Sequence, residues 1–214
     1  MSVPTPLKSE LGDPTWEIAS LFPMQGQWSE QDYLSLETNH LIEFSHGRLE
    51  VLPMPTELHQ LIAFFLCSQL RNLNQSLPNQ SATDDSRGVA LMAPFRIRLP
   101  TGKFREPDVM YMLPEHRHRR YSKYWDGADL VIEVVSEDDP NRDLITKRTE
   151  YALAQIPEYW IVDTRDRSIY VLTLDKGATE YRQAGRYGDG DWANSILLPT
   201  FNVAVTSVFN QAQR

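Results

Sequence analysis

The residues of this chain best suited to chemistry are acids placed next to apolar strands. Pro107-Asp108 closes a short strand-like segment, and Glu133 interrupts the apolar run over residues 128–135. Because burying an unpaired charge is costly, acids are rare on such strands. Two carboxylates at adjacent strand ends, with a backbone carbonyl such as that of Val134, suit Mg²⁺ or Mn²⁺, which prefer oxygen ligands.

A lysine near these acids would complete a site for phosphodiester hydrolysis. A metal polarises a phosphoryl oxygen and activates a water, and a lysine orients that water or stabilises the developing charge. Asp143, Lys147 and Tyr151 recur at four-residue spacing, so they share one helical face. The spacing alone leaves alternatives open, because Pro-Asp is a common turn pair and Asp143–Lys147 fits a surface ion pair of little energetic value.

Alternation and helical periodicity predict the elements that position these residues. We expect a helix over residues 30–37, a hairpin over 41–52 with Gly47 in its turn, and a helix capped by Thr56 with a buried stripe up to Leu70. Residues 72–87 read as a loop. A last helix is expected over residues 141–155. The expected strands cover residues 89–92, 95–99, 104–113, 130–135, 158–163 and 168–174, with edge strands over 181–184 and 196–198.

This order of elements predicts an α/β or α+β domain with a mixed central sheet flanked by helices. The length of 214 residues suits one domain. The first 27 residues contain four prolines and little periodicity, so we expect a mobile extension over residues 1–27 and a single domain over 28–214.

Composition excludes several classes of protein. A formal net charge of -8 argues against a general nucleic-acid coat protein, which needs clustered cations. The local exception is the basic run over residues 116–120, which is either a nucleic-acid contact or a solvated loop. Cys67 is the only cysteine and fits a reducing cytoplasm. We expect no secretory signal and no membrane span, since no basic-then-apolar start and no long apolar run is present.

Several motifs together resemble the restriction-endonuclease-like endonuclease family that was once a domain of unknown function and is abundant in photosynthetic bacteria. The resemblance covers most of residues 30–200 and is more specific in its second half. Its motifs are Glu43-Phe44-Ser45-His46-Gly47, His59, Arg105-Glu106-Pro107-Asp108, Glu133-Val134-Val135-Ser136, Asp143 with Lys147, and Pro157-Glu158-Tyr159-Trp160-Ile161-Val162-Asp163.

The resemblance implies a restriction-endonuclease-like core of the nuclease superfamily whose motif is Pro-Asp, then Asp or Glu, any residue, and Lys. It carries Asp108 and Glu133 over as metal ligands. The motif's lysine should follow Glu133 by two residues, where this chain has Val135. The resemblance therefore nominates Lys147, on the next helix, as the catalytic lysine. Glu43 and His59 match upstream positions of the family as further catalytic candidates, with pairing inside the hairpin and a plain helix-start residue as the respective alternatives.

Two functions are consistent with this sequence. The first is a Mg²⁺-dependent endonuclease acting on DNA; the second is a catalytically inactive nuclease-fold protein that binds nucleic acid or another protein. A homodimer is a further expectation, because interface cores are rich in aromatic residues. The alternative is ordinary core packing of the same side chains, which are Tyr121, Tyr124, Trp125, Tyr159 and Trp160.

Overall fold

The computed structural model describes residues 22–37, 40–73, 87–136 and 139–211. The expected N-terminal extension lies outside the described residues up to residue 21, and so do residues 74–86 of the expected loop. The residues after position 21 contact the first hairpin. The N–H of Gly26 donates to the carbonyl of Gly47 (2.7 Å), and the side-chain amide of Gln25 pairs with both backbone groups of Leu49.

The larger of two mixed sheets has six strands in the order β11-β10-β9-β8-β6-β3. β8 and β9 are parallel and the remaining pairs are antiparallel. Its strands are β3 (Val89–Met92), β6 (Val109–Met112), β8 (Leu130–Val134), β9 (Glu158–Asp163), β10 (Ser168–Thr173) and β11 (Arg182–Tyr187).

The smaller sheet has five strands in the order β2-β1-β5-β4-β7, and only β4 and β7 are parallel. Its first two strands form the expected hairpin, and Gly47 occupies the turn with a φ of 78°. Its strands are β1 (Ile42–Ser45), β2 (Arg48–Val51), β4 (Arg96–Leu99), β5 (Lys103–Arg105) and β7 (Tyr124–Asp126).

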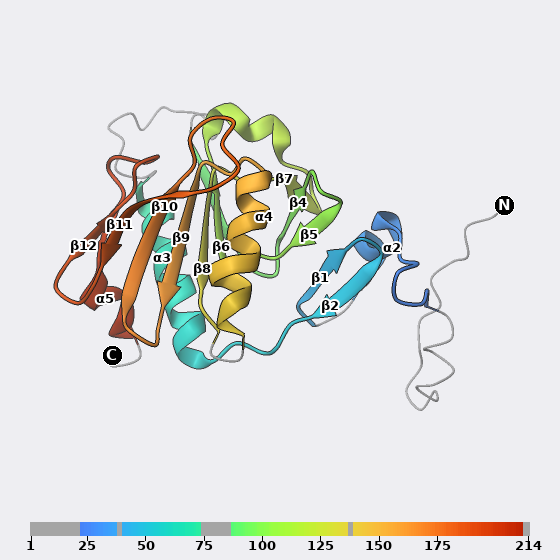
Figure 1. Cartoon of the computed structure of the whole chain (residues 1–214), viewed down its shortest axis with the longest axis horizontal. Helices are drawn as coiled ribbons and strands as arrows, with labels where there is room; N and C mark the ends of the chain where they lie inside the picture. The colour runs from blue at the N-terminus through green and yellow to red at the C-terminus, as the bar shows by residue number, and fades with distance from the viewer. Residues whose placement is uncertain (1–21, 38–39, 74–86, 137–138, 212–214) are drawn as a thin grey trace.

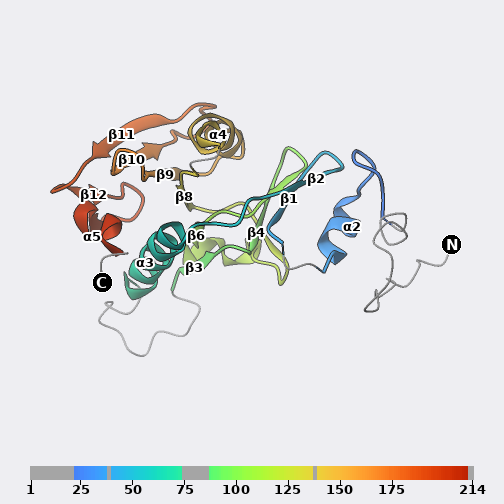
Figure 2. The same cartoon turned by 90° about the horizontal axis from the view of Figure 1, so that it is seen from below.

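Helices cover both faces of the six-stranded sheet (Figures 1 and 2). On one face lie α3 (Glu57–Leu73), which buries Ile62, Leu66 and Leu70, and the short α5 (Val205–Phe209). On the other face lies α4 (Arg148–Leu153), preceded by a π-helix, η3 (Arg142–Lys147). Away from the sheet, α2 (Glu30–Ser35) packs Tyr33 on the five-stranded sheet. The expected mixed α+β fold with helices around mixed sheets is confirmed.

The strand predicted over residues 104–113 is wrong in one respect: it is two strands in two sheets. The chain leaves the five-stranded sheet after β5 and enters the six-stranded sheet as β6. Pro107 has no N–H to offer a strand neighbour. The N–H groups on either side bond to side chains instead, Glu106 to Glu43 (3.1 Å) and Asp108 to Glu133 (3.4 Å). This break places Asp108 at the start of β6.

The C-terminal part also differs from the prediction. No strand covers residues 196–198, because the N–H groups of Ile196 and Leu197 donate to the carboxylate of Glu158. A separate hairpin of β12 (Trp192–Asn194) and β13 (Asn202–Ala204) lies around this segment. The other expected edge strand is present as β11. Neither periodicity nor alternation predicts β7, α5 or the 3₁₀ helix η2 (Pro114–Arg119).

Candidate active site

Antiparallel pairing of β6 with β8 brings the two strand-end acids together. Val109 lies opposite Ile132, so Asp108 meets the last residues of β8. The N–H of Val134 donates to Oδ2 of Asp108 (2.7 Å), and the N–H of Asp108 points to Oε2 of Glu133 (3.4 Å). Glu133 is buried, whereas Asp108 is partly exposed. Val134 thus contacts the site through its N–H, and its carbonyl remains a predicted metal ligand.

Lys147 stands on the helix and not at position 135 of the strand, yet its side chain reaches Glu133. Its Nζ lies 3.0 Å from Oε2 of Glu133 and 3.2 Å from Oδ1 of Asp143. Both helical residues are buried, so their pairing is not a surface ion pair. They lie at the two ends of η3, and π-helical turns occur frequently at functional sites. One turn later, the hydroxyl of Tyr151 donates to Oε1 of Glu133 (2.6 Å).

His59 and Glu43 flank this centre from opposite sides. Nε2 of His59, at the start of α3, lies 3.1 Å from Oδ2 of Asp108, and its buried Nδ1 has no hydrogen-bond partner among the described residues. Glu43, from β1, accepts the N–H of Glu106 and lies 3.9 Å from Lys147. Its other oxygen pairs with Arg142. All five candidate side chains therefore gather at one end of β6 and β8.

Burial and mutual repulsion shift the ionisation of this cluster. The pKa of Glu133 is raised to about 8, first by burial and then by the acids Asp108 and Asp143, against the opposing charge of Lys147. Burial also raises the pKa of Asp143. Burial alone would lower the pKa of Lys147, but the surrounding carboxylates raise it above its ordinary value, so this amine stays charged. Burial lowers the pKa of His59, yet its hydrogen bond to Asp108 outweighs that effect and the pKa is raised.

The donor set fits a hard divalent cation. Three acids, Asp108, Glu133 and Asp143, lie around a single lysine, so the cluster offers more carboxyl groups than one lysine can neutralise. Mg²⁺ is typically held by one or two carboxylates and keeps several waters. Among the residues that the structure describes, no cluster of three or more His, Cys, Asp or Glu is arranged as an all-protein metal cage. The residues therefore suit an ion that shares its coordination with water and substrate.

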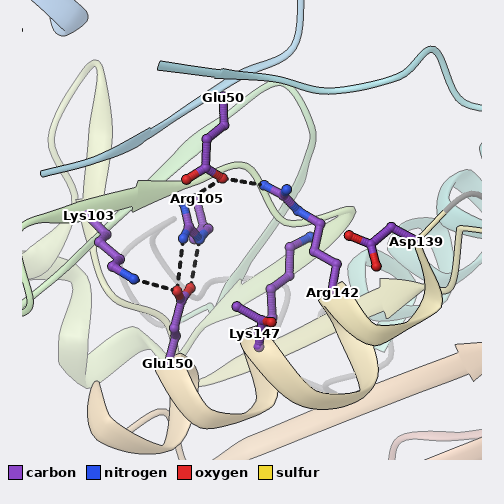
Figure 3. Close-up of a pocket in the computed structure, with 8 residues that line it drawn as sticks. Glu50, Lys103, Arg105, Asp139, Arg142, Lys147 and Glu150 are labelled. Carbon is purple, nitrogen blue, oxygen red and sulfur yellow. Dashed lines mark hydrogen bonds and ion pairs between the residues drawn. The ribbon is translucent and has the colours of Figure 1, made fainter. Parts of the chain in front are cut away.

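A pocket of about 190 Å³ opens next to Lys147. It lies between the five-stranded sheet, which supplies Glu50 and Lys103, and the helical segment from η3 into α4 (Figure 3). Its walls carry four basic residues, Lys103, Arg105, Arg142 and Lys147, and three acids, Glu50, Asp139 and Glu150. Salt bridges connect the side chains from the sheet with those from the helix. Glu150 accepts two hydrogen bonds from Arg105 and one from Lys103, all between 2.7 and 2.9 Å.

The family follows from comparison with known proteins. The model of the Uma2 family, described as "Putative restriction endonuclease", matches residues 30–206. The chain belongs to this family. It is also similar to the crystal structure of a putative nuclease belonging to DUF820 from Anabaena variabilis, with a TM-score of 0.65 and 14% identity over 85% of this chain and 97% of that one. At this identity the likeness shows the shared fold. No curated protein matches the chain.

The basic run lies away from the candidate site of this Uma2-family chain. It forms η2, which begins two residues after β6, whereas Asp108 immediately precedes that strand. The buried carboxylate of Asp129 anchors it, through Nδ1 of His116 (2.7 Å) and the N–H of Leu113 (2.7 Å). The run therefore has a structural anchor, and its contact with nucleic acid stays a prediction.

The aromatic residues expected at a dimer interface divide into two groups. Trp125, Tyr159 and Trp160 are buried in the core of the single chain, which is the alternative interpretation. Tyr121 is exposed and stacks on Tyr124 (5.0 Å between ring centroids). A homodimer thus stays a prediction without support from the three core residues. None of the described helices is long and apolar enough to cross a membrane.

Sequence reasoning missed some of the charged residues around the site. Arg105 and Arg142 contact Glu43 from positions 62 and 99 residues later in the chain, and no spacing rule links such distant residues. Tyr151 was recognised as sharing a helical face with Lys147, but its hydrogen bond to Glu133 was not foreseen. The four-residue spacing, combined with the buried acid, was the signal that could have found it.

Proposed function

We propose that this Uma2-family protein is a divalent-metal-dependent endonuclease that hydrolyses phosphodiester bonds in DNA. The convergence of Asp108, Glu133 and Lys147 carries the proposal, because phosphodiester hydrolysis needs carboxylates for a metal and a fixed positive charge at the phosphate. Family membership supports nuclease activity in general. The metal and the choice of DNA are the further steps of the proposal.

Each site residue has a distinct task in this proposal. Asp108 and Glu133 would hold Mg²⁺ or Mn²⁺, with the carbonyl of Val134 as a third ligand. When bound, the ion supplies a Lewis acid and a water of lowered pKa. Lys147, fixed by Glu133 and Asp143, stabilises the negative charge that develops on the phosphate. His59 holds the Asp108 carboxylate in place.

Two further expectations accompany the proposed activity. The lone, buried Cys67 is consistent with a reducing cytoplasm. A homodimer would let two sites address the two strands of a duplex. The alternative function, an inactive nuclease fold that only binds nucleic acid or another protein, applies if the wild-type protein cleaves no substrate with any metal.

Plasmid cleavage tests the proposal. Wild type should nick or cut supercoiled DNA in Mg²⁺ or Mn²⁺ and not in EDTA. Lys147→Ala should lose about 100-fold or more in rate while it still binds DNA, since it removes a charge needed in the transition state. Lys147→Arg should also be slow, because a planar guanidinium does not replace a compact ammonium.

Three controls make this experiment decisive. Asp108→Ala should be inactive and should bind Mn²⁺ more weakly in calorimetry. Lys176→Ala removes an exposed lysine and should keep the wild-type rate. Thermal melts of each variant separate lost chemistry from lost folding. Equal cleavage by wild type and Lys147→Ala would exclude this role of the lysine, and no cleavage by wild type with any metal would favour the binding-only alternative.

A further inference from the structure

The pocket next to Lys147 contains two arginines in different states. Arg105 is buried and saturated: it bonds to Glu150 through two nitrogens and to Ser45 (3.1 Å). Arg142 is more exposed, and both of its hydrogen bonds leave from one nitrogen, Nη2. Its buried Nε has no partner among the described residues. Arg142 therefore has hydrogen-bonding capacity that the fold does not use.

The carboxylate on the pocket side of Arg142 is Glu50, and it is weakly held. Glu50 lies on β2, the edge strand of its sheet, and about a third of its side chain is exposed. It accepts a hydrogen bond from Arg142 (3.0 Å), interacts with the side chain of Ser45 and lies 3.8 Å from Arg105 (Figure 3). In contrast, Glu43 and Glu150 hold the same arginines from buried positions. Glu50 can therefore turn into solvent without leaving a buried arginine unpaired.

Without Glu50, the pocket becomes a recess lined by more basic residues than acids. Lys103, Arg105, Arg142 and Lys147 would then share the lining with Glu150 and the exposed Asp139. A guanidinium with spare donors at the wall of such a recess is suited to a phosphate oxyanion. The recess adjoins the proposed catalytic lysine, so a phosphate placed in it would be a neighbour of the one being cleaved.

We propose that this pocket is a subsite for a non-scissile phosphate of the nucleic-acid backbone, with Arg142 as its main ligand and Glu50 as the carboxylate that the phosphate displaces. The proposal rests on the proposed function for the identity of the polymer. It assigns opposite effects to two contacting residues. Glu50 competes with substrate for Arg142 and weakens binding, whereas Arg142 strengthens it.

DNA binding measured without cleavage tests the subsite. A fluorescent 20-base-pair duplex is titrated in Ca²⁺ over a range of KCl concentrations. Glu50→Gln, which keeps the shape and removes the charge, should bind about two- to five-fold more tightly at low salt, the size typical of a partly exposed charge pair. Arg142→Gln should bind more weakly, and the slope of log affinity against log salt should fall by about 1, as for one lost phosphate contact.

Matched controls separate the subsite from general electrostatics. Glu180→Gln and Arg182→Gln make the same charge changes at exposed positions at the start of β11, outside the pocket, and should bind duplex like wild type. Glu50 is partly exposed, so its variant stays informative even if Arg142→Gln fails to fold because Glu43 loses a partner.

The outcomes distinguish this inference from the proposed function. If wild type binds and cleaves DNA while Glu50→Gln and its control bind equally, the subsite is refuted and the nuclease stands. If Glu50→Gln tightens and Arg142→Gln weakens binding but wild type cleaves nothing, the subsite stands and hydrolysis is refuted. If Glu180→Gln tightens binding as much as Glu50→Gln, the effect is net charge and the subsite is refuted.

Discussion

Two buried glutamates on neighbouring parallel strands of this protein are held in opposite ways. Glu133 on β8 and Glu158 on β9 each have 1% of their surface exposed. The register pairs Glu133 with Ile161 and Glu158 with Leu130, so the two acids lie toward opposite ends of the same strand pair. Burial is therefore equal, and only the partners differ.

Glu158 is saturated by fixed neutral donors. Oε1 accepts the indole N–H of Trp160 (2.7 Å) and the hydroxyl of Ser195 (2.6 Å), and Oε2 accepts the N–H groups of Ile196 (2.8 Å) and Leu197 (2.7 Å). Three of these donors, those of Ser195, Ile196 and Leu197, lie in the segment that connects β12 with β13. The acid of the Pro157-Glu158-Tyr159-Trp160 motif thus has a structural role as a hydrogen-bond acceptor.

Glu133 has one neutral donor side chain, Tyr151, and otherwise faces charges. Its Oε2 lies near Lys147 and the N–H of Asp108, and two more carboxylates stand close by. The comparison teaches that a buried acid serving structure is fully hydrogen-bonded, whereas Glu133 lies among other acids that raise its pKa. Ionising Glu133 therefore costs stability until a cation relieves the repulsion.

Removing each acid should separate the two roles, and this is the largest effect we expect. Glu158→Ala leaves four donors without an acceptor, of which the side chains of Trp160 and Ser195 are buried, and should lower the free energy of unfolding by about 3 kcal/mol or more. Glu133→Gln relieves repulsion with Asp108 and Asp143 and should change the free energy of unfolding by less than about 1 kcal/mol, or raise it. Urea unfolding in EDTA measures both. Equal losses in the two variants would contradict the distinction.

The burial of a third acid, Glu106, should make the free energy of unfolding depend on pH. Burial raises the pKa of Glu106 to about 7, with Arg96 opposing the rise. Between about pH 4.5 and pH 7 the folded chain holds a proton that the unfolded chain has released. Its contribution to stability is therefore fully present below about pH 4.5 and is lost as the pH rises to about 7, by at most about 3 kcal/mol.

Glu106→Gln should flatten this part of the stability profile. The measurement is the free energy of unfolding at pH 5 and pH 8 for wild type, Glu106→Gln and the exposed control Glu115→Gln. The fall from pH 5 to pH 8 should be smaller in Glu106→Gln than in the other two proteins. Parallel profiles for all three would show that Glu106 is ionised throughout this range in the folded protein.

The sequence predicted those parts of the site that follow from local pattern. Helical spacing placed Lys147 on one face with Asp143 and Tyr151, and the family resemblance nominated it as the catalytic lysine. An acid inside an apolar strand marked Glu133. Thr56 bonds to the N–H of His59 (3.2 Å) at the start of the predicted helix. The break within residues 104–113 could also have been predicted, because a proline inside a strand pattern argues against a continuous strand.

Other features depend on contacts between distant parts of the chain. Arg142 and Glu50 are 92 residues apart, and nothing in their local sequence links them. The strand β7 has only three residues and joins its sheet through a parallel pairing with β4, so its local pattern is too short to detect. Three of the four donors of Glu158 lie 37 to 39 residues further along, in a segment without periodicity.

The smallest effect that we expect on cleavage comes from removing the hydroxyl of Tyr151, which donates a hydrogen bond to Glu133. Tyr151→Phe keeps the ring against Tyr159 but frees Oε1 of Glu133. Loss of one hydrogen bond to a carboxylate costs about 1.5 kcal/mol, so the cleavage rate should fall about ten-fold, with the KM for DNA unchanged.

Tyr181→Phe is the matched control, because its buried hydroxyl bonds to the carbonyl of Ile156 (2.7 Å), away from the site. Both variants should lose similar stability, and only Tyr151→Phe should cleave slowly. If the two variants cleave at the same rate, Glu133 needs no help from Tyr151 to keep its orientation, and Lys147 with the backbone of Asp108 is enough to fix it.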